Sequence, residues 1–159
     1  MPTREIRTSV VTDGTRQELW ELLTSVHGVT SCVAPGADIH AVEGGRWLLA
    51  FDARGERADD GGTILKYARD QELVVGFRAP AQLTSLQRAP TRLTLAIEPL
   101  APARQRLVLL HAGFGEGGDW DRLYAHLTEA WEPVLDRVRR RMLLLSRTID
   151  SYDPFWAGL

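Results

Sequence analysis

The segment Gly113-Phe114-Gly115-Glu116-Gly117-Gly118 formally matches the glycine pattern that cradles the phosphates of dinucleotides. In dinucleotide-binding proteins such glycines join a strand to a helix, and a further parallel strand brings an acidic residue to the ribose. Here a helical pattern follows the glycines and no strand pattern comes after it. The segment is therefore interpreted as a flexible strand-to-helix connection, a candidate cavity gate, and no dinucleotide or other cofactor is expected.

The chain has four histidines: His27, His40, His111 and His126. None lies three to five residues from another, and no cysteine or carboxylate completes a ligand set, so no metal site is predicted. His111 shares the parity of Leu107 and Leu109, which indicates an imidazole on an apolar strand face. A hydrogen-bonded structural histidine is the favoured interpretation, and a polar anchor inside a ligand cavity is the alternative.

The sequence offers no arrangement of nucleophile and base that is typical of a hydrolase. It has no Gly-x-Ser-x-Gly turn, and its single cysteine, Cys32, has no neighbouring histidine or arginine to activate the thiol. Glu116, Asp119 and Asp121 lie at the start of a predicted helix, where capping is favoured over cation binding. No catalytic residue is predicted, and an enzyme is the less favoured class.

Charge and hydropathy narrow the class of protein further. Nineteen Lys and Arg against 21 Asp and Glu give a net charge of -2, which favours neither nucleic acid nor anionic membrane as a partner. The apolar runs are far shorter than the ~20 residues that span a bilayer, and the N-terminus lacks the apolar stretch of a signal peptide. An arginine cluster at 137–141 is interpreted as a solvated helix face. One cytoplasmic domain is expected.

Alternating polar and apolar residues predict about seven strands. They span residues 3–12, 38–42, 46–52, 63–69, 72–78, 91–98 and 105–114. In the sixth, Leu93, Leu95 and Ile97 alternate with polar residues, as in an antiparallel sheet with one face in water. Turns rather than helices separate most of these strands, which predicts a meander.

Two helical regions flank the strands. Thr15 and Glu18 form a capping box that predicts a helix from Arg16, with a stop at Gly28 and a second short turn at 30–33. After residue 118 apolar residues recur at helical spacing as far as position 145, which predicts one long helix across the sheet.

The last residues form a separate aromatic segment. Residues 1–147 are assigned to one domain, and residues 148–159 to a C-terminal tail with Tyr152, Phe155 and Trp156. Packing of these side chains against their own domain is favoured, and packing onto a second subunit in a homodimer is the alternative.

Three segments carry a resemblance to a known family. They are Leu19-Trp20-Glu21-Leu22-Leu23-Thr24, the pair Gly44-Gly45 before an aromatic strand, and Leu110-His111-Ala112-Gly113-Phe114 before the Trp120 helix. In this order the chain resembles bacterial domains similar to the C-terminal domain of the activator of Hsp90 ATPase homologue, within the START-like (SRPBCC, Bet v 1-like) superfamily. The resemblance implies an α+β helix-grip fold with a curved antiparallel sheet of six or seven strands, two short helices and a long C-terminal helix.

In such a fold, inward side chains of the sheet and the long helix can line a pocket. We therefore expect a domain that binds a small apolar, aromatic or lipid-like ligand between the two. The predicted ligand-binding residues are Trp47, Phe51, Tyr67, Phe77, Arg78, His111, Trp120, Tyr124 and Trp131. Among them, His111, Tyr67 and Arg78 are the candidates to orient the ligand.

Two other functions stay open from the same resemblance. A cyclase or hydratase acting on a polyketide-like substrate requires a pair of polar residues that face each other across the pocket. A protein-interaction module like the co-chaperone from which the family takes its name rests on family analogy.

Overall fold

Seven strands form one antiparallel sheet in the computed structural model, which describes residues 4–52, 54–144 and 155–159. The strands are β1 (Arg4–Asp13), β2 (Gly36–Ile39), β3 (Arg46–Ala50), β4 (Asp60–Ala68), β5 (Glu72–Arg78), β6 (Thr91–Ala101) and β7 (Arg104–Phe114). Their order across the sheet is β1-β7-β6-β5-β4-β3-β2. Strands β2 to β7 therefore form the predicted meander, and β1 pairs with β7 at one edge.

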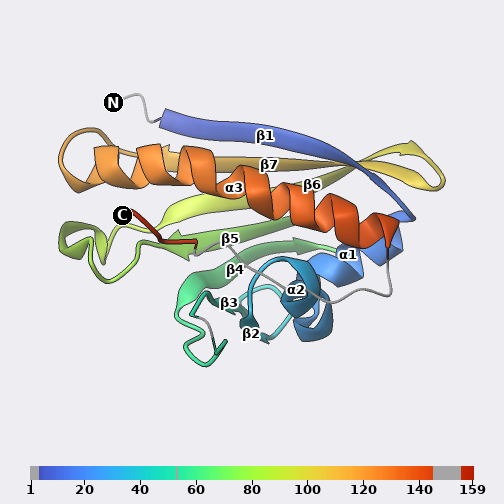
Figure 1. Ribbon diagram of the computed structural model, residues 1–159, viewed down its shortest axis with the longest axis horizontal. Helices are drawn as coiled ribbons and strands as arrows, with labels where there is room; N and C mark the ends of the chain where they lie inside the picture. The colour runs from blue at the N-terminus through green and yellow to red at the C-terminus, as the bar shows by residue number, and fades with distance from the viewer. Residues whose placement is uncertain (1–3, 53, 145–154) are drawn as a thin grey trace.

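Helices cover one face of this curved sheet (Figure 1). Helices α1 (Arg16–Thr24) and α2 (Val26–Cys32) follow β1, and a 3-10 turn, η1 (Thr84–Leu86), precedes β6. Helix α3 (Asp119–Leu143) has 25 residues, and at ~1.5 Å per residue it is long enough to cross the whole sheet. The α+β helix-grip architecture is thus confirmed. Three predictions fall outside the described residues. They concern the end of the long helix near residue 145, the domain boundary at 147, and Tyr152.

The core lies between α3 and the sheet. Leu93, Leu95 and Ile97 of β6 are buried on this side, whereas Arg92 is exposed on the other. Helix α3 supplies a stripe of buried residues: Leu123, Leu127, Trp131, Val134, Leu135, Val138 and Met142. Each large apolar side chain buried here stabilises the fold by about 1.5–3 kcal/mol relative to an exposed one.

The boundary between α1 and α2 differs from the sequence prediction. Ser25 interrupts the helices with an extended backbone (φ −108°, ψ 150°), and its hydroxyl accepts a hydrogen bond from the Gly28 N–H at 2.9 Å. The second helix therefore begins at Val26 rather than near residue 30. Gly28 lies inside α2, where a Cβ would approach Leu22 Cα to 2.5 Å. This glycine permits close contact between the helices instead of ending α1.

Replacing Gly28 with alanine is expected to destabilise the protein by about 1–3 kcal/mol, because the added methyl group must push α1 and α2 apart. Denaturant unfolding measures the loss. The control is His27→Ala on the exposed side of α2, which is expected to change stability by less than about 0.5 kcal/mol. Equal stabilities of the two variants would contradict the close contact.

Of two further predictions about the helices, one is confirmed and the other is wrong in part. The capping box is confirmed, since the Glu18 N–H donates to Thr15 Oγ1 and the Thr15 N–H to Glu18 Oε1, both at 3.1 Å. The arginine cluster at 137–141 is not wholly solvent-facing. Arg137 Nε donates to the Cys32 carbonyl at 3.1 Å, so it satisfies an acceptor at the C-terminal end of α2.

Candidate ligand site between the sheet and helix α3

His111 lies at the centre of the core, with 0% of its surface exposed. Its Nδ1 accepts a hydrogen bond from the Trp131 indole N–H at 3.0 Å, and its Nε2 lies 2.6 Å from Thr91 Oγ1. Thr91 Oγ1 in turn donates to the Phe77 carbonyl at 3.1 Å. Because an indole nitrogen only donates, the imidazole proton is on Nε2 and is directed at Thr91. Both imidazole nitrogens are therefore satisfied within the protein.

Burial lowers the pKa of His111 to about 3, because the charged imidazolium would lose its hydration. Aromatic rings surround the imidazole, with centroid distances of 5.1 Å to Phe77, 4.7 Å to Phe114 and 5.9 Å to Trp131. A neutral, fully hydrogen-bonded histidine in an aromatic cage matches the structural interpretation of this residue.

A small cavity lies between α3 and the sheet among the described residues. Its volume is about 10 Å³, which is at the lower limit for a single water molecule. The residues that line it are Leu23, Val33, Trp47, Leu93, Leu95, Leu107, Trp131, Val134, Leu135 and Val138. Phe77 and His111 pack against Trp131 at its border. These four predicted residues thus meet as packed core, and a ligand among them would require the core to open.

The C-terminal tail inserts an aromatic ring beside this core. Phe155 is 6% exposed, and its ring stacks on that of Phe51 with centroids 4.1 Å apart and planes 9° apart. It also meets Trp131 edge-on at 5.1 Å. Figure 1 shows the C-terminal segment on the same side of the sheet as α3. The described part of the tail therefore packs against its own domain.

Polar side chains hold the next residue, Trp156. Its indole N–H donates to Asp60 Oδ1 at 3.1 Å, and its ring stacks on His126 with centroids 5.4 Å apart. His126 Nε2 also donates to the carbonyl of Phe155. Burial raises the pKa of Asp60 to about 6.

We call Phe51, Asp60, His126 and Trp131 the tail slot, because these four residues hold the aromatic pair of the tail. A cleft of about 330 Å³ opens beside the pair and includes Phe51 and Asp60 in its lining. Asp60 and His126 carry no local sequence signal of a site, since one lies in a turn-rich segment and the other on a regular helix. Only the fold brings them to one aromatic side chain.

The remaining predicted residues do not line this small cavity. They are Tyr67, Arg78, Trp120 and Tyr124. The Tyr67 hydroxyl accepts from the Trp20 indole N–H at 3.2 Å, and Arg78 donates to the Asp59 carbonyl at 2.9 Å. The two α3 residues contact Phe114 edge-on, at centroid distances of 6.5 and 5.4 Å.

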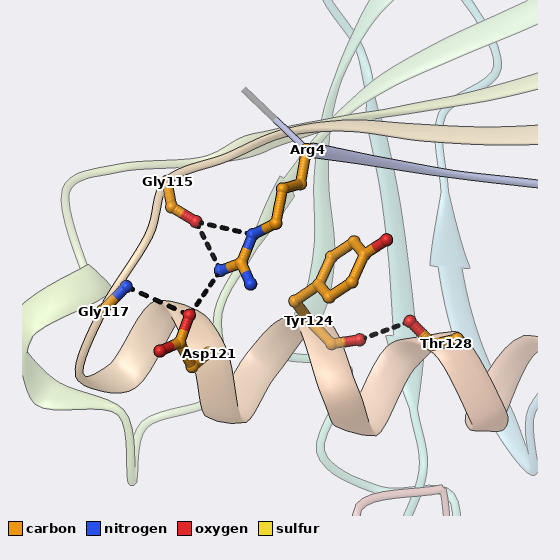
Figure 2. Close-up of polar contacts among 6 residues, drawn as sticks. All are labelled: Arg4, Gly115, Gly117, Asp121, Tyr124 and Thr128. Carbon is orange, nitrogen blue, oxygen red and sulfur yellow. Dashed lines mark hydrogen bonds and ion pairs between the residues drawn. The ribbon is translucent and has the colours of Figure 1, made fainter. Parts of the chain in front are cut away.

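Arg4 of β1 holds the glycine-rich connection before α3 in place (Figure 2). Arg4 Nε and Nη2 donate to the Gly115 carbonyl at 3.2 and 2.6 Å, and Nη2 lies 2.8 Å from Asp121 Oδ1. The same carboxylate oxygen accepts from the Gly117 N–H at 3.0 Å. The guanidinium carbon lies 4.6 Å from the centroid of the Tyr124 ring. In this structure Asp121 and Arg4 therefore both order the loop.

Replacing Arg4 with alanine is expected to accelerate hydrogen exchange of the Gly117 amide roughly tenfold, because the lost contacts to Gly115 and Asp121 contribute about 1–2 kcal/mol of local stability. NMR-detected hydrogen exchange gives the rate. Arg7→Ala is the matched control, since Arg7 is an exposed arginine of the same strand. Unchanged exchange in the Arg4 variant would show that the loop is ordered without it.

Other candidate chemistry is limited in the part of the chain that the structure describes. No group of three or more His, Cys, Asp or Glu side chains there is arranged to hold a metal ion. Burial raises the pKa of the Cys32 thiol to about 12, which leaves it protonated and unreactive at neutral pH. Among the described helices, none is long and apolar enough to cross a membrane.

A family profile matches most of the chain. The profile described as "Activator of Hsp90 ATPase homolog 1-like protein" matches residues 13–142. The chain belongs to this family. The AHSA1-like match ends within α3, so Phe155 and Trp156 lie outside it. A comparison with curated proteins finds no match.

Solved structures share the AHSA1-like fold at low sequence identity. An Aha1 dimer from Colwellia psychrerythraea superposes with a TM-score of 0.71 at 14% identity, over 89% of this chain and 97% of that one. CalU16 from Micromonospora echinospora gives 0.68 at 17% identity, over 90% and 78%. An Hsp90 activator from Plasmodium falciparum gives 0.62 at 14% identity, over 90% and 96%. At these identities the likeness concerns the fold alone.

Proposed function

We propose that this AHSA1-like domain binds a planar aromatic small molecule in the tail slot, at the edge of the space between the sheet and α3. The observation that supports the proposal is the position of Phe155, whose ring lies between Phe51 and Trp131 although it comes from outside the family match. Stacked and edge-on contacts of this kind are equally available to the ring of a ligand. Binding then exchanges the ring of the tail for the ring of the ligand.

The polar groups of the tail slot define the rest of the ligand. His126 donates to a carbonyl and Asp60 accepts from an indole N–H, so the ligand that replaces the tail offers one acceptor and one donor. The adjoining cleft of about 330 Å³ is within the usual range of small-molecule sites. An aromatic carbonyl compound that also carries an N–H or O–H group fits these requirements.

Acid–base catalysis on the same class of compound is the second candidate function. Asp60 and His126 both contact the side chain of Trp156, so they flank whatever replaces it. Burial raises the pKa of Asp60 to about 6, which is near the pH at which a general acid or base works best. Asp60→Asn separates the two functions, because it keeps a polar contact for binding and abolishes proton transfer.

A thermal-shift screen tests the proposed function. At a ligand concentration of about 100 times Kd, specific binding adds about 2.7 kcal/mol of stability, which corresponds to a rise in Tm of roughly 5–10 °C for a chain of this size. Hydroxylated bicyclic aromatic ketones are expected to give such shifts, and saturated ketones of equal size to give none. Equal responses to both series, or none to either, would contradict the proposal.

A further inference from the structure

The face of the sheet opposite α3 carries a row of residues in which two arginines flank Thr63 and Gly76. The strand register places Arg46 beside Thr63, Thr63 beside Gly76, and Gly76 beside Arg92. The next residue along each of these four strands is buried in the core. Strand alternation therefore directs the whole row away from α3 and into solvent.

Gly76 leaves a gap in this row, because it places no side chain between Thr63 and Arg92. A groove at this position has a volume of about 730 Å³, and Leu48, Leu65 and Arg78 also line it. The Leu65 side chain is 45% exposed there. The groove thus combines an apolar floor with cationic ends.

The charges of the groove are only partly compensated. Arg46 pairs with Asp38 at 2.9 Å, where both side chains are about half exposed, and Arg78 donates to the backbone carbonyl of Asp59. Among the described residues no hydrogen bond or ion pair engages the guanidinium of Arg92. The groove is therefore locally cationic on a chain whose net charge is -2.

We infer that this groove docks an extended acidic segment of a partner protein, in which two acidic side chains four residues apart flank an apolar one. Arg46 and Arg92 are separated by three interstrand spacings of ~4.8 Å, or ~14 Å, and four residues of extended chain cover ~13 Å. Residues i, i+2 and i+4 of such a segment share one face. The acidic residues then reach the two arginines, and the central apolar residue reaches Leu65.

The charge and the apolar floor of the groove favour an acidic peptide segment over a second copy of the chain or a nucleic acid. A second copy docked through the same face would bring arginines against arginines. A nucleic acid would leave the apolar floor formed by Leu48 and Leu65 without a matching surface. The groove lies on the opposite face of the sheet from the tail slot, so the inference is independent of the proposed function.

Fluorescence anisotropy with a labelled peptide tests this inference on the 159-residue chain. The probe carries two glutamates that flank Ala-Leu-Ala, and the comparison peptide carries the same residues with the glutamates adjacent. Arg92→Glu is expected to weaken binding of the probe at least tenfold, whereas Arg104→Glu, at an exposed position on β7, is expected to change it less than twofold.

Gly76→Val supplies a test that leaves every charge in place. A Cβ at Gly76 meets Leu65 at an ordinary 3.8 Å, and valine favours strands, so the variant is expected to fold and to fill the groove. Binding at least tenfold weaker than wild type supports the inference. It is overturned if Gly76→Val binds like wild type, if both peptides bind equally, or if Arg104→Glu weakens binding as much as Arg92→Glu. Self-association in analytical ultracentrifugation that Gly76→Val abolishes would also overturn it, in favour of a second copy.

Discussion

Replacing His111 with glutamine is expected to reduce the loss of stability that occurs between pH 7 and pH 4. Burial lowers the pKa of His111 to about 3 in the folded protein, whereas an unfolded histidine titrates near 6.5. Between these values the unfolded chain binds the histidine proton, so the contribution of His111 to the free energy of unfolding falls as the pH decreases. The contribution is complete above about pH 6.5, and about 3 kcal/mol of it is lost by pH 4.

Urea unfolding at intervals from pH 7 to pH 4 measures this slope. Glutamine can accept from Trp131 and donate to Thr91 as the imidazole does, but it does not titrate. The control is His27→Gln, which makes the same substitution at an exposed histidine. An equal slope in wild type and His111→Gln would mean that His111 is protonated in the folded state.

Replacing Phe155 with alanine is expected to tighten binding of an aromatic ligand ten- to a hundredfold. In the wild type, a ligand in the tail slot must first displace a ring whose burial is worth about 1.5–3 kcal/mol, and each 1.4 kcal/mol is a factor of ten in Kd. The alanine variant no longer opposes binding in this way. Isothermal titration with 5-hydroxy-1-tetralone, a hydroxylated bicyclic aromatic ketone, measures the change.

Phe114→Ala is the matched control for this result. Phe114 is also buried, with 0% of its surface exposed, but it lies in the core beside His111 rather than in the tail slot. Its removal leaves a cavity too small for a bicyclic compound and leaves the tail in place. A similar gain in both variants would mean that any new cavity binds the probe and that the tail slot has no special role.

The fold follows closely from local patterns in the sequence. The capping box at Thr15 and the alternation through Leu93 and Leu95 each depend on residues close together in the chain, and the structure confirms them. Gly28 and Arg137 were misinterpreted, because their roles depend on atoms of another element. A glycine that ends a helix and one that allows two helices to touch have the same local sequence.

The candidate site is predicted less well from the sequence than the fold is. The parity of His111 correctly indicates an apolar environment, but whether that environment is open or filled depends on how Trp131 and the strands pack together. Phe77 and Arg78 are adjacent in β5 and therefore point to opposite faces. Tyr67 follows a register shift between Ile64 and Lys66, which simple alternation does not reveal.

The most direct test of the proposed function follows the Trp156 indole during ligand titration. The chain has five tryptophans, so a ¹H–¹⁵N spectrum has few indole resonances, and Trp156→Phe assigns the one of interest. If a ligand takes the tail slot, this resonance is expected to move to the position of a solvent-exposed indole, in proportion to occupancy, as the bond to Asp60 breaks. Saturable binding of an aromatic carbonyl compound that leaves the Trp156 resonance unmoved would contradict it.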